Sequence, residues 1–179
     1  MRRTESSKFS AIALVQDHYD TLRNYGTKRR RPADYLAYLG VPAAIAGGVW
    51  YFDGRARNVP DVLAAIAILT GLIFNVFVLI FDLTARATDT LPPQMRQFVD
   101  QLADELRANV SYAVLVGIVL TGLLGGVVMF TDTDKPLGRV STLLVVFAGV
   151  HLLLTIFMIL KRVRAMFRSF RVRREDPVP

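Results

Sequence analysis

The chain has 179 residues, 53% of them hydrophobic, and a formal net charge of +7. It contains no cysteine and two histidines, which excludes disulfides and cysteine nucleophiles and argues against a histidine-rich metal site. The hydrophobic residues form four blocks with charges between and outside them, a pattern unlike a soluble domain built around one core. Basic residues commonly flank membrane spans, and no nucleic-acid-binding module accompanies the positive charge here. We therefore expect no nucleic-acid partner.

The four blocks predict an all-α membrane protein with four transmembrane helices and cytoplasmic amphipathic helices. In residues 8–24, apolar side chains recur at helical spacing, which predicts a helix at the membrane surface or against a partner. The predicted parts in chain order are a basic cytoplasmic segment (1–33), a hairpin with spans at 35–52 and 62–82 (34–83), an amphipathic cytoplasmic helix (84–110), a hairpin with spans at 112–130 and 141–160 (111–162), and a basic cytoplasmic tail (163–179).

The distribution of lysine and arginine predicts the orientation of the spans. Residues 1–33, 161–179 and 84–109 hold 8, 7 and 3 of these residues, or 18 together, whereas the two short loops hold 4. Because positive charge favours the cytoplasmic side, both termini are expected inside and both short loops outside.

An internal duplication is suggested by a string that occurs twice. Gly47-Gly48-Val49-Trp50-Tyr51-Phe52 in the first span matches Gly125-Gly126-Val127-Val128-Met129-Phe130 in the third at an offset of 78 residues. The same offset carries Gly71 onto Gly149, in the second and fourth spans. We therefore expect two parallel-repeat hairpins, although such strings also recur by chance in apolar sequence.

Small residues in the first and third spans are the candidates for helix packing, since close backbone approach drives helix association in lipid. We expect these two spans to meet, within one chain or between copies in a homo-oligomer. The residues concerned are Ala43, Gly47, Gly48, Thr121, Gly122, Gly125 and Gly126.

Polar residues of the second and fourth spans are the candidates for function, because an intramembrane polar group is costly unless it is paired. Asn75 and His151 lie at similar predicted depth and are expected either to line a polar path in an oligomer or to act as packing contacts, with His151 bonded to Asn75 or Thr155. Asp82, at the cytoplasmic end of the second span, is expected to form a local ion pair or to join a ring of carboxylates at a pore mouth.

Basic clusters on the cytoplasmic side are expected to bind anionic lipid headgroups or an acidic cytosolic protein. Their members are Arg29, Arg30, Arg31, Lys161, Arg162, Arg164, Arg168 and Arg171. The acidic residues Asp100, Asp104 and Glu105 are interpreted as the solvated face of the helix in 84–110.

No catalytic or cofactor-binding motif is visible, so neither an enzyme nor a cofactor is expected. In its plan of a short helix, two hairpins and a basic tail, the chain resembles small four-span membrane proteins of bacterial antiphage defence systems. The phrases Gly71-Leu72-Ile73-Phe74-Asn75 and Leu160-Lys161-Arg162-Val163-Arg164-Ala165 carry that resemblance. It implies a multi-pass protein of the bacterial inner membrane. Small size, the absence of an enzyme site, the small residues of the first and third spans and the polar residues of the second and fourth predict an oligomeric channel or membrane-perturbing effector. The alternative from the residues themselves is a non-catalytic anchor that docks a cytosolic partner.

Overall fold

The computed structural model describes residues 11–21, 32–88, 93–132 and 135–175, and the side chains of 32–35, 83–99, 101–102 and 165–175 lie outside that description. Over the described residues the chain forms α1 (Ala11–Asp20), α2 (Pro32–Tyr51), α3 (Val59–Thr88), α4 (Pro93–Phe130) and α5 (Arg139–Glu175). No strand occurs in these ranges, so the predicted all-α class is confirmed.

Three helical stretches have the length and composition needed to cross a bilayer. They are Val59–Asp82, Ala103–Phe130 and Arg139–Arg164, and α2 adds the shorter apolar segment Leu36–Tyr51. The protein thus has the character of a helical membrane protein, with α3, α4 and α5 as its candidate spans.

The two longest helices continue past the apolar blocks. The 38 residues of α4 run unbroken from Pro93, which suits the first turn of a helix, into the third block. At 1.5 Å per residue α4 is about 57 Å long, roughly twice the thickness of a hydrocarbon core. The 37 residues of α5 likewise continue into the basic tail. The boundaries predicted near residues 110 and 162 therefore fall inside continuous helices.

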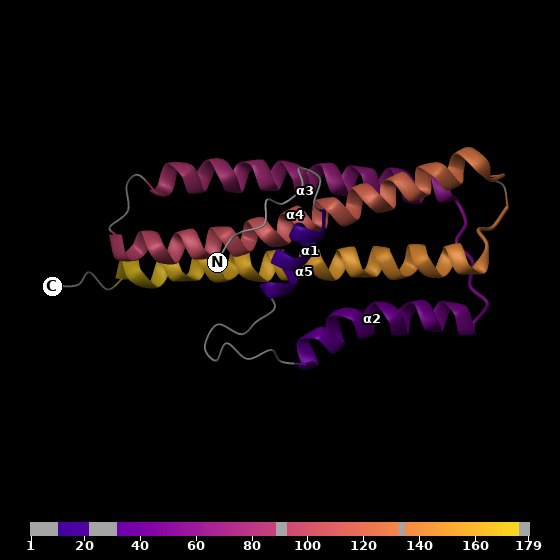
Figure 1. Ribbon diagram of the computed structural model, residues 1–179, viewed down its shortest axis with the longest axis horizontal. Coiled ribbons are helices and arrows are strands. Elements are labelled where there is room, and N and C mark those ends of the chain that lie inside the picture. The colour runs from indigo at the N-terminus through magenta and orange to yellow at the C-terminus, as the bar shows by residue number, and fades with distance from the viewer. Residues whose placement is uncertain (1–10, 22–31, 89–92, 133–134, 176–179) are drawn as a thin grey trace.

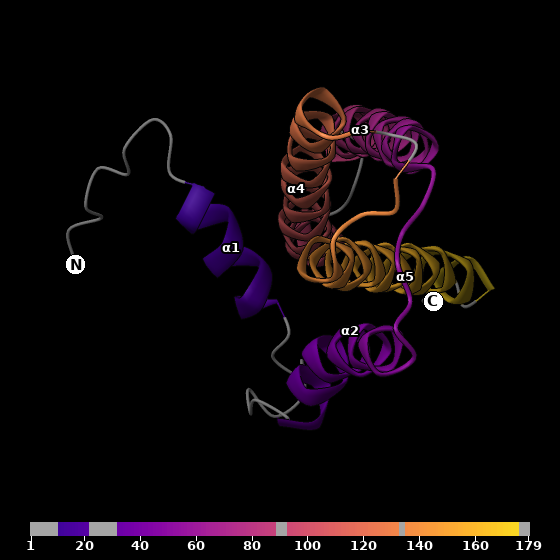
Figure 2. The ribbon, with the colours of Figure 1, turned by 90° about the vertical axis from the view of Figure 1, so that its right-hand side faces the viewer.

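The long helices form an open row rather than two hairpins side by side. Backbone contacts join α3 to α4, α4 to α5, and α5 to α2, and within the described residues α2 approaches neither α3 nor α4 (Figure 2). The two helices of the predicted first hairpin are consequently linked by a loop without packing on each other.

Packing within the row differs from the predicted meeting of the first and third spans. A side chain added at Gly47, Gly48, Gly122, Gly125 or Gly126 would meet nothing within 4 Å, so these glycines mark no close contact inside one chain. The expectation that α2 and α4 meet within one chain is wrong, because α2 lies on α5. The close approach lies at Gly117 of α4, where an added side chain would overlap the Thr70 hydroxyl of α3.

Apolar side chains of α3, α4 and α5 form the core. One cluster joins Ile73, Val110 and Leu152, and a second, near the other end of the row, joins Val59, Leu124 and Leu137. The described apolar core is therefore held by these three helices and the loop before α5.

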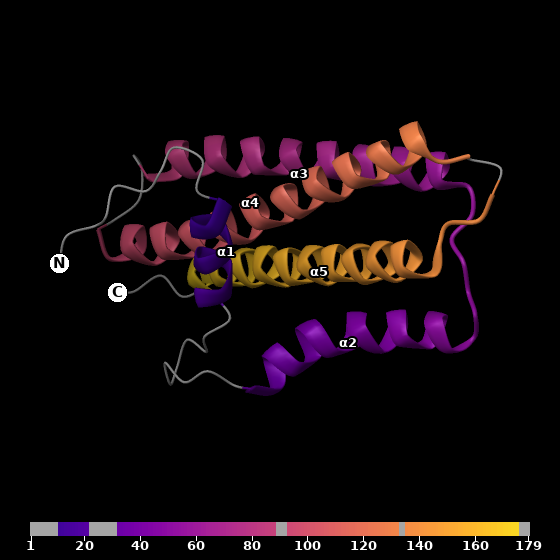
Figure 3. The same cartoon turned by 45° about the vertical axis from the view of Figure 1, so that its right-hand side comes forward.

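The two short loops lie together at one end of the molecule (Figures 1 and 3). The Leu137 amide donates to the Ala56 carbonyl at 2.8 Å, and the Ala56 amide donates to the Thr142 hydroxyl at 3.1 Å. Arg139 binds Asp53 across the same junction. The C-terminal end of α3 and the N-terminal end of α4 lie at the opposite end, and α1 crosses the bundle between the two ends (Figure 1).

Candidate functional site

A cluster of buried polar and aromatic side chains lies where α1 crosses the bundle. It takes His18 from α1, Tyr38 from α2, Tyr112 from α4, and His151 and Thr155 from α5. All five are buried, and His18 and Thr155 are 0% exposed. Four helices distant in sequence therefore meet at this point, which we call the histidine–tyrosine cluster.

Hydrogen bonds fix the α5 side of the cluster. The Tyr112 hydroxyl and His151 Nε2 lie 2.7 Å apart, and the Thr155 hydroxyl donates to the His151 carbonyl at 2.9 Å. The Tyr38 hydroxyl bonds the Thr155 hydroxyl at 2.5 Å, which ties α2 to α5. His151 Nδ1 is buried and has no hydrogen-bond partner.

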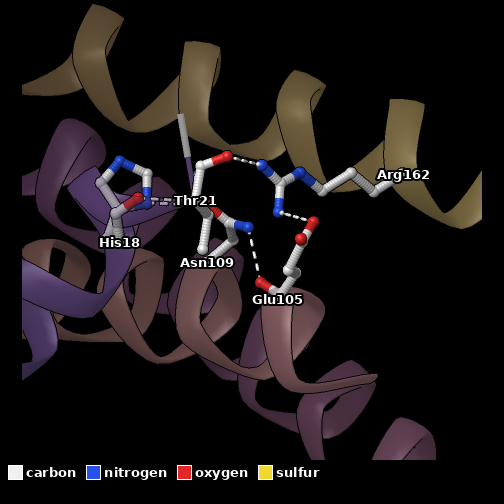
Figure 4. A network of polar contacts seen from close by, with 5 residues as sticks. All are labelled: His18, Thr21, Glu105, Asn109 and Arg162. Atoms are coloured by element: carbon white, nitrogen blue, oxygen red, sulfur yellow. Dashed lines mark hydrogen bonds and ion pairs between the residues drawn. The ribbon is translucent and has the colours of Figure 1, made fainter. Parts of the chain in front are cut away.

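A second network ties α1 to α4 and α5 (Figure 4). His18 Nδ1 donates to Asn109 Oδ1 at 2.8 Å, and Asn109 Nδ2 donates to the Glu105 carbonyl at 2.6 Å. Arg162 Nη1 pairs with Glu105 Oε2 at 2.9 Å, and Arg162 Nη2 donates to the Thr21 carbonyl at 2.6 Å. The guanidinium of α5 thus connects α4 to the C-terminal end of α1.

The predicted pairing of His151 with Asn75 is wrong. His151 lies inside the bundle and bonds Tyr112, whereas Asn75 is exposed on α3. The predicted link between Thr155 and His151 is present, but through the backbone carbonyl of the histidine. Asp82 is exposed at a position seven residues, or about two helical turns, beyond Asn75 on α3.

The basic residues separate into different environments. Lys161 and Arg164 are exposed, as headgroup or partner binding requires. Arg162 is instead committed to Glu105 and Thr21. Glu105 is therefore not part of a solvated face, although Asp100 and Asp104 are exposed as predicted. Arg29, Arg30 and Arg31 lie outside the described residues, as do the side chains of Arg168 and Arg171.

Sequence reasoning missed the residues that build the cluster from α1 and α4. The spacing of Glu105, Asn109 and Tyr112 places them on one face of α4, which was a readable signal. His18 follows Leu14 by four residues and thus shares the apolar face of α1. The approach of that face to α4 could not be derived from either helix alone.

Replacing Tyr112 by phenylalanine removes the hydrogen bond to His151 Nε2, while Nδ1 of the same buried ring already has no hydrogen-bond partner. We expect a loss of about 1–2 kcal/mol in the free energy of unfolding, the usual cost of orphaning a buried polar group. Denaturation by graded SDS in mixed micelles measures it. Tyr51→Phe is the matched control, because Tyr51 is 82% exposed, and an equal loss there would contradict the assignment.

Fold and site together define a helical protein with candidate membrane spans around a buried histidine–tyrosine cluster. Comparison with protein-family models, curated proteins and solved structures gave no match to the chain. In the part of the chain that the structure describes, no group of three or more His, Asp or Glu side chains is placed to hold a metal ion.

Proposed function

We propose that this chain is a four-span protein of the bacterial inner membrane that assembles as a homo-oligomer and acts as an ion channel or membrane-perturbing effector. The three long apolar helices support three of the spans, and the apolar segment of α2, lying along α5, supports the fourth. The lysine and arginine distribution favours both termini inside, and the grouping of the two short loops at one end agrees with that orientation.

The outward face of α3 carries the proposal. Ala67, Gly71, Asn75 and Asp82 are all exposed on this helix, which packs through its backbone on α4 alone among the described helices. An amide directed at lipid tails is costly, because hydrocarbon offers it no hydrogen bond. A water-filled path, or a second copy of the chain, would satisfy Asn75. In a ring of copies, Asn75 and Asp82 would line one face of such a path.

The other end of the row offers a second open surface. Ala43 and Gly47 of α2 are exposed there, and Gly122 of α4, in the interior of the row, is exposed as well. Small residues let helices of different copies approach closely in lipid. If the chain is a parallel repeat, the α4–α5 contact has a counterpart between α2 and α3, and this is the pair that one chain leaves unmade. Contact between α2 of one copy and α3 of the next would supply it.

Replacing Asn75 by leucine tests the proposal. Wild-type protein in liposomes is expected to pass a fluorescent ion or small dye and to run as an oligomer when its mass is measured in detergent. Asn75→Leu is expected to reduce the flux at least tenfold, because it removes the amide from the path. Val76→Leu is the control, since Val76 is exposed on the same helix but points in another direction. A monomer in detergent together with tight wild-type vesicles would refute the channel.

A role in antiphage defence follows from the topological resemblance alone. Cells expressing the wild-type chain are expected to plate phage at least tenfold less efficiently than cells expressing Asn75→Leu. Equal plating against a broad phage panel would remove the defence role and leave the channel to be judged by flux.

The long cytoplasmic extension favours one alternative, a non-catalytic anchor. α3, α4 and α5 continue well past α1 on the side away from the short loops (Figure 1). This extension carries the exposed charges Asp104, Arg107, Lys161 and Arg164. Stoichiometric recovery of one cytosolic protein with the purified chain, lost in Lys161→Glu/Arg164→Glu, would favour the anchor over the channel.

A further inference from the structure

The short helix α1 contacts three helices of the bundle, two of which, α2 and α4, share no backbone contact among the described residues. Its backbone contacts α4, its His18 ring lies 5.4 Å from the Tyr38 ring of α2, and its Thr21 carbonyl accepts from Arg162 of α5. α2 and α4 have no backbone contact among the described residues, and α1 lies over the histidine–tyrosine cluster between them. The apolar clusters of the bundle include no residue of α1, so the bundle core does not depend on its docking.

The side chain that anchors α1 to the bundle is the imidazole of His18, which contacts the aromatic rings of three tyrosines. His18 stacks on Tyr112 with ring centres 3.9 Å apart and planes at 6°. Tyr19 and Tyr38 stand at 5.3 and 5.4 Å from the same ring. These contacts leave none of the His18 surface exposed to solvent.

The hydrogen bonds around His18 identify the neutral form of its ring as the one that fits the docked helix. Asn109 Nδ2 is engaged with the Glu105 carbonyl, so Asn109 Oδ1 faces His18 and accepts a proton from Nδ1. Nε2 of the neutral ring is then unprotonated, and it is buried without a hydrogen-bond partner. A proton added at Nε2 would create a buried cation with no acceptor at that atom.

The charged and titratable groups around His18 do not compensate such a cation. Arg162 of α5 is positive, and the Glu105 carboxylate of α4 is already paired with it. Asp17 and Asp20 of α1 itself are exposed, so water screens their attraction for such a cation. The titratable or charged groups on the elements packed around His18 include Asp17, Tyr19 and Asp20 of α1, Tyr38 of α2, Glu105 and Tyr112 of α4, and His151 and Arg162 of α5, of which His151 and Arg162 act on its charge.

We propose that α1 is an acid-released latch: it stays docked over the histidine–tyrosine cluster while His18 is neutral and leaves when His18 takes a proton, opening the cluster to the cytoplasmic side. Release would uncover Tyr112 and Asn109, together with the groups of α2 and α5 beneath α1. The proposal concerns the N-terminal helix and does not depend on the channel function.

The direction of the pH effect follows from the physical state of the ring. Burial lowers the pKa of His18 from 6.5 to about 4, with His151 and Arg162 acting in the same direction and the Asn109 hydrogen bond opposing them. Docking of α1 is therefore strongest above pH 6.5, where the His18 ring is neutral in both the docked and the released helix. It weakens as the pH falls toward 4. The ratio of docked to released helix is expected to fall by up to tenfold per pH unit between these two values, and by about 70-fold between pH 7.5 and pH 4.5.

Distance measurement between two spin labels tests the latch in the full chain. The sequence has no native cysteine, so Gln16→Cys on the outer side of α1 and Met129→Cys near the far end of α4 can be labelled selectively. Met129 lies about 25 Å along α4 from Tyr112 at 1.5 Å per residue, a suitable range for pulsed dipolar spectroscopy. In lipid nanodiscs at pH 7.5 we expect one narrow distance, and at pH 4.5 a broad distribution.

Two substitutions separate the latch from a general effect of acid. His18→Phe keeps a flat ring against Tyr112 but cannot titrate, and Asn109 keeps its bond from the Thr21 hydroxyl, so the narrow distance should persist at pH 4.5. His18→Ala should give the broad distribution at both pH values, with bundle helicity by circular dichroism retained. Asp17→Asn should respond to acid as the parent does. A distance that stays narrow in the parent, or that broadens equally in His18→Phe, would overturn the proposal.

Discussion

Replacing Gly117 by valine is expected to separate α3 from α4 and to lower the free energy of unfolding by about 2–3 kcal/mol, the upper range for overpacking a close contact. The added side chain would overlap the Thr70 hydroxyl, which is held toward its own helix by a 2.7 Å bond to the Ile66 carbonyl. Thr70 is buried and β-branched, so it has little freedom to turn away.

Gly122→Val is the matched control for this substitution, since it adds the same side chain to the same helix. Gly122 is exposed, and a side chain there meets nothing within 4 Å of the described chain. Graded SDS denaturation of the two variants in monomeric detergent particles should separate them clearly. Equal stability of Gly117→Val and wild type would show that α3 and α4 do not approach at this point.

Removing the carboxylate of Glu105 is expected to be the most damaging change at the end of the bundle away from the two short loops. The Glu105 and Arg162 side chains are 22% and 20% exposed, so the pair is largely withdrawn from water. Breaking a buried pair leaves an uncompensated charge and costs about 3–5 kcal/mol. Partial exposure reduces this, and we expect about 2–3 kcal/mol for Glu105→Gln.

The neighbouring residue supplies the control. Asp104 pairs with Arg107 at 3.4 Å, but both side chains are well exposed, so Asp104→Asn should change stability by less than about 0.5 kcal/mol. A double-mutant cycle with Arg162→Gln should give a coupling energy above about 1 kcal/mol for Glu105. Independent effects of the two substitutions would contradict a direct pair.

The Glu105 pair also explains why charge patterning misjudged this residue. Asp100, Asp104 and Glu105 read alike in sequence, because each is a carboxylate on a mixed helix. Glu105 shares its face with Asn109 and Tyr112, and this face meets α1 and α5. The sequence of α4 shows which residues share this face, but it does not show which helices pack against it.

Small residues illustrate a similar separation between pattern and contact. Seven of them in the first and third spans have spacings suited to close packing, yet the row places those spans apart. One glycine, Gly117, has a tight neighbour in the described bundle other than in a loop. A glycine permits close approach of a second helix but does not require it. Whether a glycine lies at a tight contact therefore depends on which helix packs against it.

What the sequence determined by itself is the helical character of the chain and the location of its long apolar segments, because hydrophobic length and periodicity are local properties. The candidate spans in α3 and α5 begin and end within four residues of the predicted ones. The candidate span in α4 ends at the predicted Phe130 but begins at Ala103, nine residues before the predicted start. The tertiary structure alone decided that α2 packs on α5, that His151 bonds Tyr112 instead of approaching Asn75, and that His18 seats α1 over the bundle. These are contacts between helices far apart in sequence. They depend on how whole surfaces fit, a property that no single stretch of residues carries.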